Sequence, residues 1–381
     1  MAKRPVFQEV SDPAASRPAT TTGMIDARPR GARRAIRAWL CVLFLLVLAM
    51  IVVGGATRLT GSGLSITVWA PVTGAIPPLN AADWQREFDL YRQIPQYQEL
   101  NRGMSLSEFQ FIYWWEWGHR QLGRVVGLVW GLGFLFFWAT SRIPAGWTPR
   151  LLGLGALGGL QGAIGWWMVS SGLNEGMLRV ASYRLATHLG IAFLILGLIA
   201  WYVMQLSRSE AELLRARRAG EARLFGISTG LLHLTFVQII LGALVAGIDA
   251  GRMYTGWPRM GGEWIPEAIW DPMIGWRNFF ENPALVQFIH RMTGYLLAIL
   301  AVVVWIRSRR SPHPATRGAF SLMIVAMAAQ IGLGILNVIH ASPLYLALTH
   351  QFGAVVLFVA ILRARHHARY PFETSIRGAG A

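Results

Sequence analysis

Long runs of apolar residues alternate with short polar segments along most of the chain. About eight of these runs approach the roughly 20 residues that an α-helix needs to cross a membrane. Pro283 and Pro343 stand where the sixth and eighth runs open, a position that suits the first turn of a helix. We therefore predict spanning helices over about 36–56, 117–139, 150–171, 181–206, 224–248, 284–306, 318–340 and 343–362.

Basic residues collect in alternate loops between these runs. Arginines crowd the segment before the first run, the linker at 207–223, the loop near 307–317 and the end of the chain. Membrane proteins keep such loops on the cytoplasmic side. We therefore place both termini in the cytoplasm, with the chain integral to the membrane. Two long loops, at about 57–112 and 249–282, fall on the outer side.

Composition changes this picture little. The chain is 54% hydrophobic and only 14% charged, whereas a soluble domain has about 25% charged residues. The basic residues behind the formal net charge of +16 collect in alternate loops, as membrane orientation requires. We therefore expect membrane lipid and no nucleic acid as a partner. Cys41 is the only cysteine and lies in the first run, which excludes an internal disulfide.

Short motifs recur between the two halves of the chain. The pattern His-Arg-x-x-Gly begins at His119 in the second run and again at His290 in the sixth. Thr-His ends at His188 in the fourth run and at His350 in the eighth, and Gln-x-x-x-Gly occurs in the third and seventh. Because each half has an even number of runs, both halves enter the membrane in the same orientation. We predict an all-α integral membrane protein of two tandem four-helix bundles, related by a parallel pseudo-twofold repeat. The predicted parts are a disordered cytoplasmic tail (1–34), an N-terminal half (35–206), a cytoplasmic linker (207–223), a C-terminal half (224–365) and a cytoplasmic tail (366–381).

The four histidines of these motifs lie near the outer ends of their runs and form one pair in each half. We expect His119 to pair with His188, and His290 with His350. Two imidazoles that face each other across a helical bundle can hold a haem iron from both sides. A single buried histidine is as often a packing residue, but four at matched depth favour metal ligands.

Three arginines accompany these candidate ligands. Arg120 and Arg291 directly follow the first histidine of each pair, and Arg124 lies one turn deeper. A guanidinium group matches a carboxylate, so these side chains are candidates to bind haem propionates. In the alternative interpretation, Arg120 and Arg291 extend toward lipid headgroups. This alternative explains Arg124 less well, because Arg124 lies one turn deeper.

One acidic residue distinguishes the two halves. Glu116 precedes His119 by three residues, whereas Gln287 stands at the matching place in the second half. Chemistry on an organic group needs an acid or base beside the reacting atom. We therefore predict a substrate site in the first half, with Glu116 as the catalytic residue, and a resident haem in the second. In the alternative, Glu116 is ionised and pairs with Arg120 or Arg124.

The remaining candidates carry less chemistry. Three histidines in inner basic segments are predicted to be solvated, namely His313, His366 and His367. Two others are predicted to serve packing or hydrogen bonding, namely His233 and His340.

Residues 79–108 form a partly amphipathic segment that we expect to lie along the membrane surface.

Two stretches carry a specific resemblance to a known family. One is Gly-Gly-Ala-Thr-Arg-Leu-Thr-Gly-Ser-Gly-Leu-Ser at 54–65, and the other is the Glu-Trp-Gly-His-Arg-x-x-Gly-Arg box that opens at Glu116. Together with the span count, the repeat and the four histidines, they make the chain similar to haem A synthase, in its proteobacterial and mitochondrial branch, over about 35–365. The chain lacks the cysteine pair that another branch carries in the first outer loop.

The resemblance implies an oxidoreductase that turns a ring methyl of haem O into the formyl group of haem A, by successive hydroxylations, for aa3-type cytochrome oxidase. It implies that His290 and His350 ligate a permanent haem b, and that His119 and His188 face the substrate haem. Contact with haem O synthase and a homo-oligomer are further expectations. The rival interpretations are a b-type cytochrome that only transfers electrons and a haem carrier or insertion protein.

Overall fold

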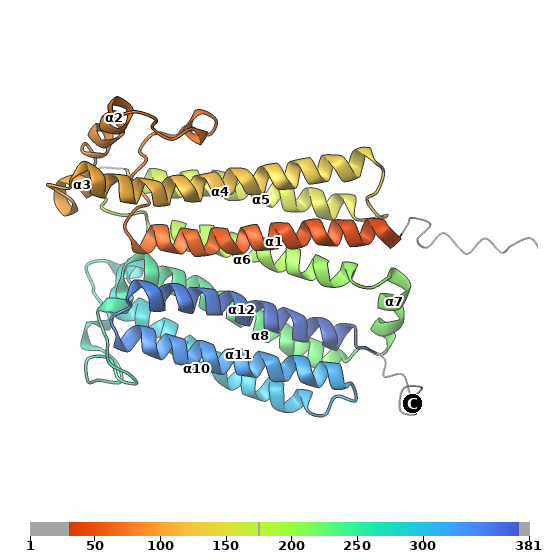
Figure 1. Cartoon of the computed structure of the whole chain (residues 1–381). Coiled ribbons are helices and arrows are strands. Elements are labelled where there is room, and N and C mark those ends of the chain that lie inside the picture. The colour runs from red at the N-terminus through yellow and green to blue at the C-terminus, as the bar shows by residue number, and fades with distance from the viewer. Residues whose placement is uncertain (1–29, 174–175, 373–381) are drawn as a thin grey trace, which may run out of the picture.

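The computed structural model describes residues 30–173 and 176–372, and these ranges are mostly helical (Figure 1). Eight of the described helices are long and apolar enough to span a membrane, which confirms the predicted all-α membrane class. Of the predicted tails (1–34 and 366–381), residues 1–29 and 373–381 lie outside the described part of the chain. Residues 30–34, predicted to be disordered, instead begin α1, and residues 366–369 end α12. The eight helices are α1 (Arg30–Leu59), α4 (Leu106–Ala139), α5 (Thr148–Gly172), α6 (Ser182–Leu206), α8 (Ala222–Gly247), α10 (Pro283–Ser308), α11 (Pro314–Ile339) and α12 (Leu344–Arg369).

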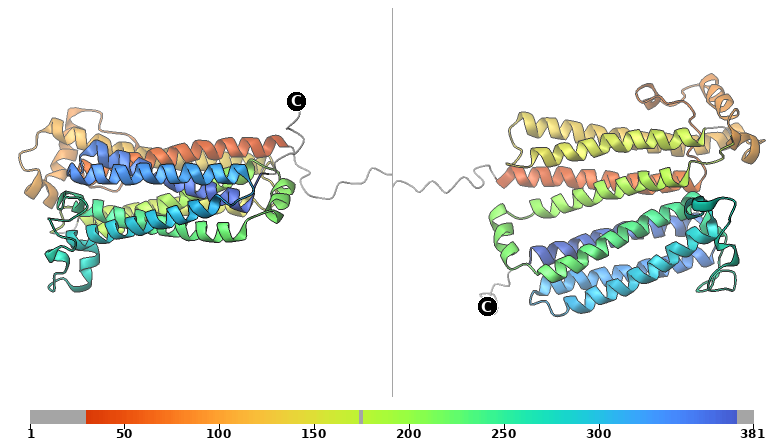
Figure 2. Two further views of the ribbon diagram at one scale, coloured as in Figure 1. Left: turned by 90° about the horizontal axis from the view of Figure 1, so that it is seen from below. Right: turned by 180° about the vertical axis from the view of Figure 1, so that it is seen from behind.

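The spanning helices run side by side in four stacked pairs (Figures 1 and 2). From one edge to the other, the pairs are α4 with α5, α1 with α6, α8 with α12, and α10 with α11. We call α1, α4, α5 and α6 the first helix group, and α8, α10, α11 and α12 the second. On either side of the seam between the groups, α1 and α6 take the place that α8 and α12 take opposite, and α4 and α5 that of α10 and α11. This arrangement is compatible with the predicted repeat.

Both ends of the described chain lie at the same end of the helices, as an even number of spans requires (Figure 1). The linker at this end forms a short helix, α7 (Glu210–Arg218), whose first turn is capped by Ser209. Arg33 of α1 donates hydrogen bonds to the carbonyl oxygens of Gln205 and Arg208. The start of α1 is thereby fixed to the end of α6.

Helix α4 begins at Leu106 rather than near the predicted residue 117. Ser105 caps its first turn, and Glu108 completes a capping box with it. The sequence prediction began at the continuous apolar run and therefore missed these earlier turns. Glu116 and His119 consequently lie inside the helix, well after its start.

The outer segment at 79–108 folds into α2 (Ala81–Tyr91) and α3 (Pro95–Leu100) beside the outer end of α4 (Figure 1). The place of this segment along the membrane surface stays a prediction, while part of its apolar face packs against α4. Phe88 and Tyr91 are buried in one cluster with Phe109 and Tyr113 of α4, and the rings of Phe88 and Phe109 stack with centroids 5.0 Å apart. The early start of α4 provides this apolar surface.

The largest hydrophobic core crosses the seam between the two helix groups. It joins residues of α1, α4, α5 and α6 to Val355, Phe358 and Leu362 of α12. The ring of Phe358 lies 5.7 Å from that of Phe193 in α6, centroid to centroid. The two groups therefore pack against each other through a continuous apolar interface. The shorter helical segments are η1 (Thr73–Ala75), η2 (Ala250–Arg252), η3 (Glu267–Ile269), η4 (Gly275–Arg277) and α9 (Asn278–Glu281).

Candidate functional site

Each of the four predicted histidine ligands rests against a glycine of a neighbouring helix. A Cβ atom on Gly54 of α1 would come within 2.9 Å of His119 Nε2, and one on Gly165 of α5 within 3.0 Å of His188 Cε1. Glycine at these positions therefore leaves the room that the imidazole rings occupy. In the second group the corresponding pairs are Gly242 with His290 (3.1 Å) and Gly334 with His350 (3.0 Å).

The predicted pairs each draw on two helices of one group. His119 belongs to α4 and His188 to α6, whereas His290 belongs to α10 and His350 to α12. That the two rings of a pair face one iron stays a prediction. Side chains from facing helices of a bundle are a common source of cofactor ligands.

A glutamine amide braces the backbone at three of the four histidines. Each glutamine precedes by one helical turn the glycine that faces the same histidine. The hydrogen bonds run from glutamine Nε2 to the histidine carbonyl oxygen: Gln161 to His188 (2.9 Å), Gln238 to His290 (2.9 Å) and Gln330 to His350 (3.0 Å).

Met50 of α1 stands where a fourth glutamine would lie. Its Cε is 3.3 Å from the Cβ position of Gly123, one turn after His119. Gln238 Nε2 is also 3.3 Å from the Cβ position of Gly294, which lies one turn after the first histidine of the second group. Met50 and Gln238 therefore hold equivalent places in α1 and α8.

Sequence reasoning found the motif at Gln161 and Gln330 but missed its copy at Gln238 and the equivalent position of Met50. The signal was present for Gln238, because Gln-x-x-x-Gly also occurs at 238–242 in the fifth run. Met50 departs from the pattern, so only the helix packing shows that it belongs to the set. The departure lies beside the histidine pair that also has the carboxylate.

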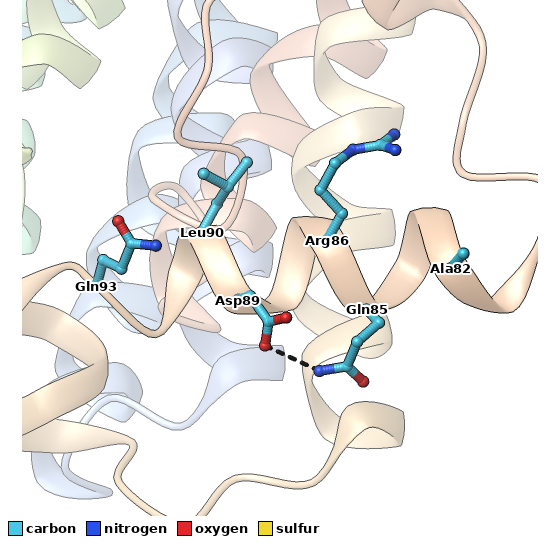
Figure 3. Close-up of a pocket in the computed structure, with 6 residues that line it drawn as sticks. All are labelled: Ala82, Gln85, Arg86, Asp89, Leu90 and Gln93. Atoms are coloured by element: carbon cyan, nitrogen blue, oxygen red, sulfur yellow. Dashed lines mark hydrogen bonds between the residues drawn. The ribbon is translucent and has the colours of Figure 1, made fainter.

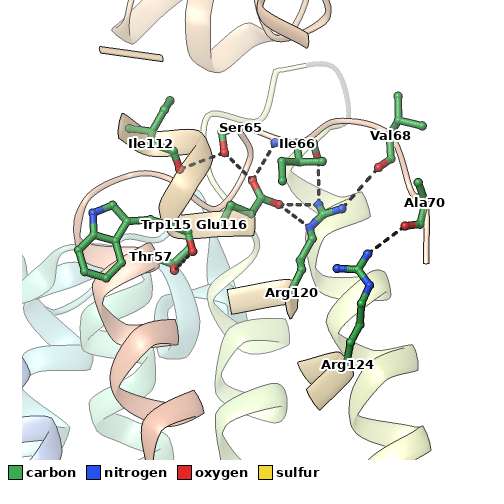
Figure 4. Close-up of polar contacts among 10 residues, drawn as sticks. All are labelled: Thr57, Ser65, Ile66, Val68, Ala70, Ile112, Trp115, Glu116, Arg120 and Arg124. Atoms are coloured by element: carbon green, nitrogen blue, oxygen red, sulfur yellow. Dashed lines mark hydrogen bonds and ion pairs between the residues drawn. The ribbon is translucent and has the colours of Figure 1, made fainter. Parts of the chain in front are cut away.

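Glu116 is 2% exposed, and four hydrogen bonds hold its carboxylate (Figure 4). Oε2 accepts from Ser65 Oγ at 2.9 Å and from the backbone N–H of Ile66 at 2.8 Å. Oε1 accepts from Nε and Nη2 of Arg120, at 3.1 Å and 2.5 Å. This ion pair corresponds to the alternative interpretation of Glu116. Both residues come from α4, one turn apart, where such pairs meet.

The arginines predicted to bind propionates donate to carbonyl oxygens of the outer loops. Figure 4 shows these contacts for Arg120 and Arg124. A guanidinium group carries five N–H donors, and Arg120 uses four of them on Glu116, Ile66 and Val68. One donor on Nη1 is left for a ligand, so contact with a propionate stays a prediction. The other loop carbonyls are those of Ala70 and Pro71 for Arg124, and of Tyr254, Gly256 and Arg259 for Arg291.

The second helix group has no such ion pair at the matching place among its described residues. Gln287 is buried and donates from Nε2 to the carbonyl oxygen of Tyr254 at 3.2 Å. Arg291 donates to the same carbonyl at 2.8 Å, while Gln287 Oε1 is buried without a hydrogen-bond partner in the described structure. The loops are thus held alike, but the first group alone brings a buried carboxylate to its arginine.

Two histidines that were predicted to be solvated are buried. His366 and His367 are 4% and 8% exposed in the last turns of α12, which continues to Arg369, beyond the predicted end at 362. The His366 ring lies 5.1 Å from that of Trp201, and the His367 ring 5.3 Å from that of Phe372. The helix extension carries these side chains into aromatic packing that the local basic composition did not reveal.

Other candidate features lie apart from the histidine pairs. His340 Nδ1 lies 2.8 Å from the carbonyl oxygen of Leu336, as its predicted hydrogen-bonding role requires. His233 is exposed on α8, so it is not a packing residue within the chain, and His313 is the half-buried N-cap of α11. The pocket in Figure 3 lies along α2, and none of its six lining residues is a predicted ligand.

Comparison with known proteins identifies the family. A model of the cytochrome oxidase assembly protein family matches residues 37–362. The chain is 74% identical to the haem A synthase of Paracoccus denitrificans, over 99% of each chain. It is 62% identical to that of Dinoroseobacter shibae, over 100% of this chain and 99% of the relative. A haem A synthase of Cereibacter sphaeroides is 59% identical, over 98% of each. The chain therefore belongs to the cytochrome oxidase assembly protein family.

Proposed function

We propose that this chain is a haem A synthase, an oxidoreductase that converts a ring methyl of haem O into a formyl group. The observation that carries this proposal is the buried ion pair of Glu116 and Arg120, beside one of two matched histidine pairs. Full-length relatives that bear this name support it. A pure electron carrier needs no difference between its two histidine pairs.

The residues at both pairs suit a haem. Imidazole nitrogens are common axial ligands of haem iron, and ring nitrogen Nδ1 is buried without a protein partner in the described structure at His188 and His350. We assign haem b to His290 and His350, and the substrate haem to His119 and His188. Bound there, haem b supplies one-electron transfer.

Glu116 is the residue that we expect to touch the methyl under attack. Each hydroxylation replaces a C–H bond of the methyl with a C–O bond. With water as the oxygen source, two electrons pass to an external electron acceptor and two protons are released, so a nearby carboxylate can accept a proton or stabilise positive charge. Arg120, Ser65 and the N–H of Ile66 fix both carboxylate oxygens before substrate arrives. The carboxylate thus needs little reorganisation during the reaction.

We further propose that the end carrying α7 faces the cytoplasm of a bacterial inner membrane, with both termini on that side. Arginines concentrate at this end, as the orientation rule for membrane proteins requires. The histidine pairs then lie toward the outer leaflet. Because haem O is poorly soluble in water, direct contact with haem O synthase and a homo-oligomer are part of this proposal.

The test is Glu116→Gln, which keeps the side-chain volume and removes the charge. We expect the purified variant to retain haem absorbance while conversion of haem O to haem A falls by about a hundredfold or more. Extraction and chromatography of the haems measure conversion. Glu108→Gln is the matched control, because this exposed residue of the same helix caps its first turn and glutamine serves that role too.

Wild-type conversion by Glu116→Gln would remove Glu116 from the mechanism. If the wild-type chain binds haem yet converts no haem O under any electron acceptor tried, the proposed function fails and electron transfer alone becomes the better assignment.

A further inference from the structure

Three of the four histidine contacts share a glutamine amide, and Met50 stands in its place at the fourth. At these three, the amide crosses from one helix to the backbone of the next, at 2.9 to 3.0 Å. The amides of Gln238 and Gln330 also lie within hydrogen-bond distance of the histidine ring. The glutamine and the facing glycine lie one turn apart on a single helix, so each such helix contacts its histidine through both residues. At His119 the contact with Gly54 remains, but the residue one turn before Gly54 is Met50, whose side chain is a thioether.

This difference changes how firmly one helix holds the next. A net contribution of about 1 kcal/mol is typical of an intramolecular hydrogen bond, and a thioether sulfur cannot donate one. Methionine also has three rotatable bonds and adapts its shape to neighbouring groups. Beside His119 the contact between α1 and α4 therefore rests on packing, and the nearest hydrogen bond between these helices runs from Thr57 Oγ1 to the carbonyl oxygen of Trp115 at 3.3 Å, one turn earlier. Beside His290 the contact between α8 and α10 is hydrogen-bonded at the histidine itself.

The two sites need opposite properties under the proposed function, on which this inference rests. Substrate must enter and product must leave at His119 and His188, whereas haem b stays at His290 and His350. We propose that Met50 is the positioning residue that makes the first site exchangeable, and that Gln238 at the equivalent place retains haem b. Met50 acts through the mobility of the α4 turn that carries His119.

Reciprocal substitutions test this inference. Met50→Gln supplies an amide at the first site, and Met50→Leu is its control, a residue of similar size that cannot donate. Gln238→Met places the thioether at the second site. Each full-length variant is purified in detergent with its haem b, loaded with haem O and mixed with excess apomyoglobin, which captures released haem. The type of haem captured identifies the site that released it.

We expect Met50→Gln to slow release of haem O about fivefold, the effect of roughly one hydrogen bond. Met50→Leu should release haem O at nearly the wild-type rate, and Gln238→Met should speed release of haem b about fivefold. An unchanged low-spin absorbance spectrum in each variant shows that both histidines still bind iron.

Equal haem O release by Met50→Gln and Met50→Leu, with both haems bound, would overturn this inference and leave the proposed function standing. Unchanged haem b release by Gln238→Met would overturn it equally. A wild-type chain that holds haem b but takes up no haem O would overturn the proposed function and this inference together.

Discussion

The carboxylate of Glu116 combines deep burial with a full set of partners. An unpaired buried charge is costly, whereas a paired and hydrogen-bonded one is tolerated. Arg120 neutralises the charge, and the hydroxyl of Ser65 and N–H of Ile66 satisfy the second oxygen. The carboxylate is therefore held in one position, with Arg120 beside it.

The glycine beside His188 allows a test at the same scale. A methyl group at Gly165 would lie 3.0 Å from His188 Cε1, whereas at Gly162, in the same helix, nothing lies within 4 Å. We expect Gly165→Ala to displace the imidazole and raise the Kd for haem O about tenfold, since overpacking costs about 1–3 kcal/mol. Titration of the purified protein with haem O, followed by absorbance, measures this. Gly162→Ala is the control and should bind as the wild type does. Equal affinities for the two variants would show that the glycine contact does not constrain the ligand.

Much of the residue-level site followed from spacing along one helix. The i to i+4 separation of Glu116 and Arg120 indicated that they could pair, and the repeated His-Arg-x-x-Gly pattern gave His119 and His290. Ser65 could not be found in this way, because the loop that brings it to α4 obeys no periodic rule. The role of Met50 could not be predicted either, because an apolar residue within an apolar run does not stand out in the sequence.

At the scale of elements, the sequence did not reveal where α4 starts or what the outer helices pack against. The span prediction measured hydropathy, and the first turns of α4 are partly polar, so its start at Leu106 was missed. The amphipathic pattern at 79–108 was read correctly as one apolar face. Composition alone does not distinguish whether this apolar face packs against lipid or protein. In the structure, its buried side chains pack against the early turns of α4.

A haem iron held by two helices needs a ligand from each, which gives a prediction for α10 and α12. We expect either His290→Ala or His350→Ala to remove most haem b from the purified protein, because one imidazole alone loses the second axial bond. The haem extracted per chain measures the loss. His340→Ala, at the exposed end of α11, should keep wild-type haem b. Full haem b in both of the first two variants would contradict the assignment of these ligands.

At the scale of the whole molecule, a charged contact joins the outer ends of the two groups. Arg58 at the end of α1 donates to the carbonyl oxygen of Gly247 at 2.9 Å and to Asp249 Oδ1 at 3.4 Å. Arg179, in the loop before α6, forms an ion pair with the same aspartate. Both arginines belong to the first half of the chain, and Asp249 follows α8.

Removing this aspartate should loosen the seam. We expect Asp249→Asn to lower the free energy of unfolding by about 2 kcal/mol, because the Arg58 side chain, 14% exposed, would lose its counter-charge. Thermal unfolding in detergent measures the change. Asp89→Asn is the control, since its ion pair with Arg92 is exposed on both sides and such pairs contribute little. Equal melting temperatures for the two variants would show that the seam does not depend on this contact.

The core that crosses the seam has a consequence for each helix group taken alone. Phe358 and Leu362 of α12 fill space among residues of the first group, so separating the groups would remove these packing contacts. Lipid chains are as apolar as these side chains, so the loss would be one of close packing and not of shelter from water. Neither group is therefore expected to keep its native packing when produced without the other.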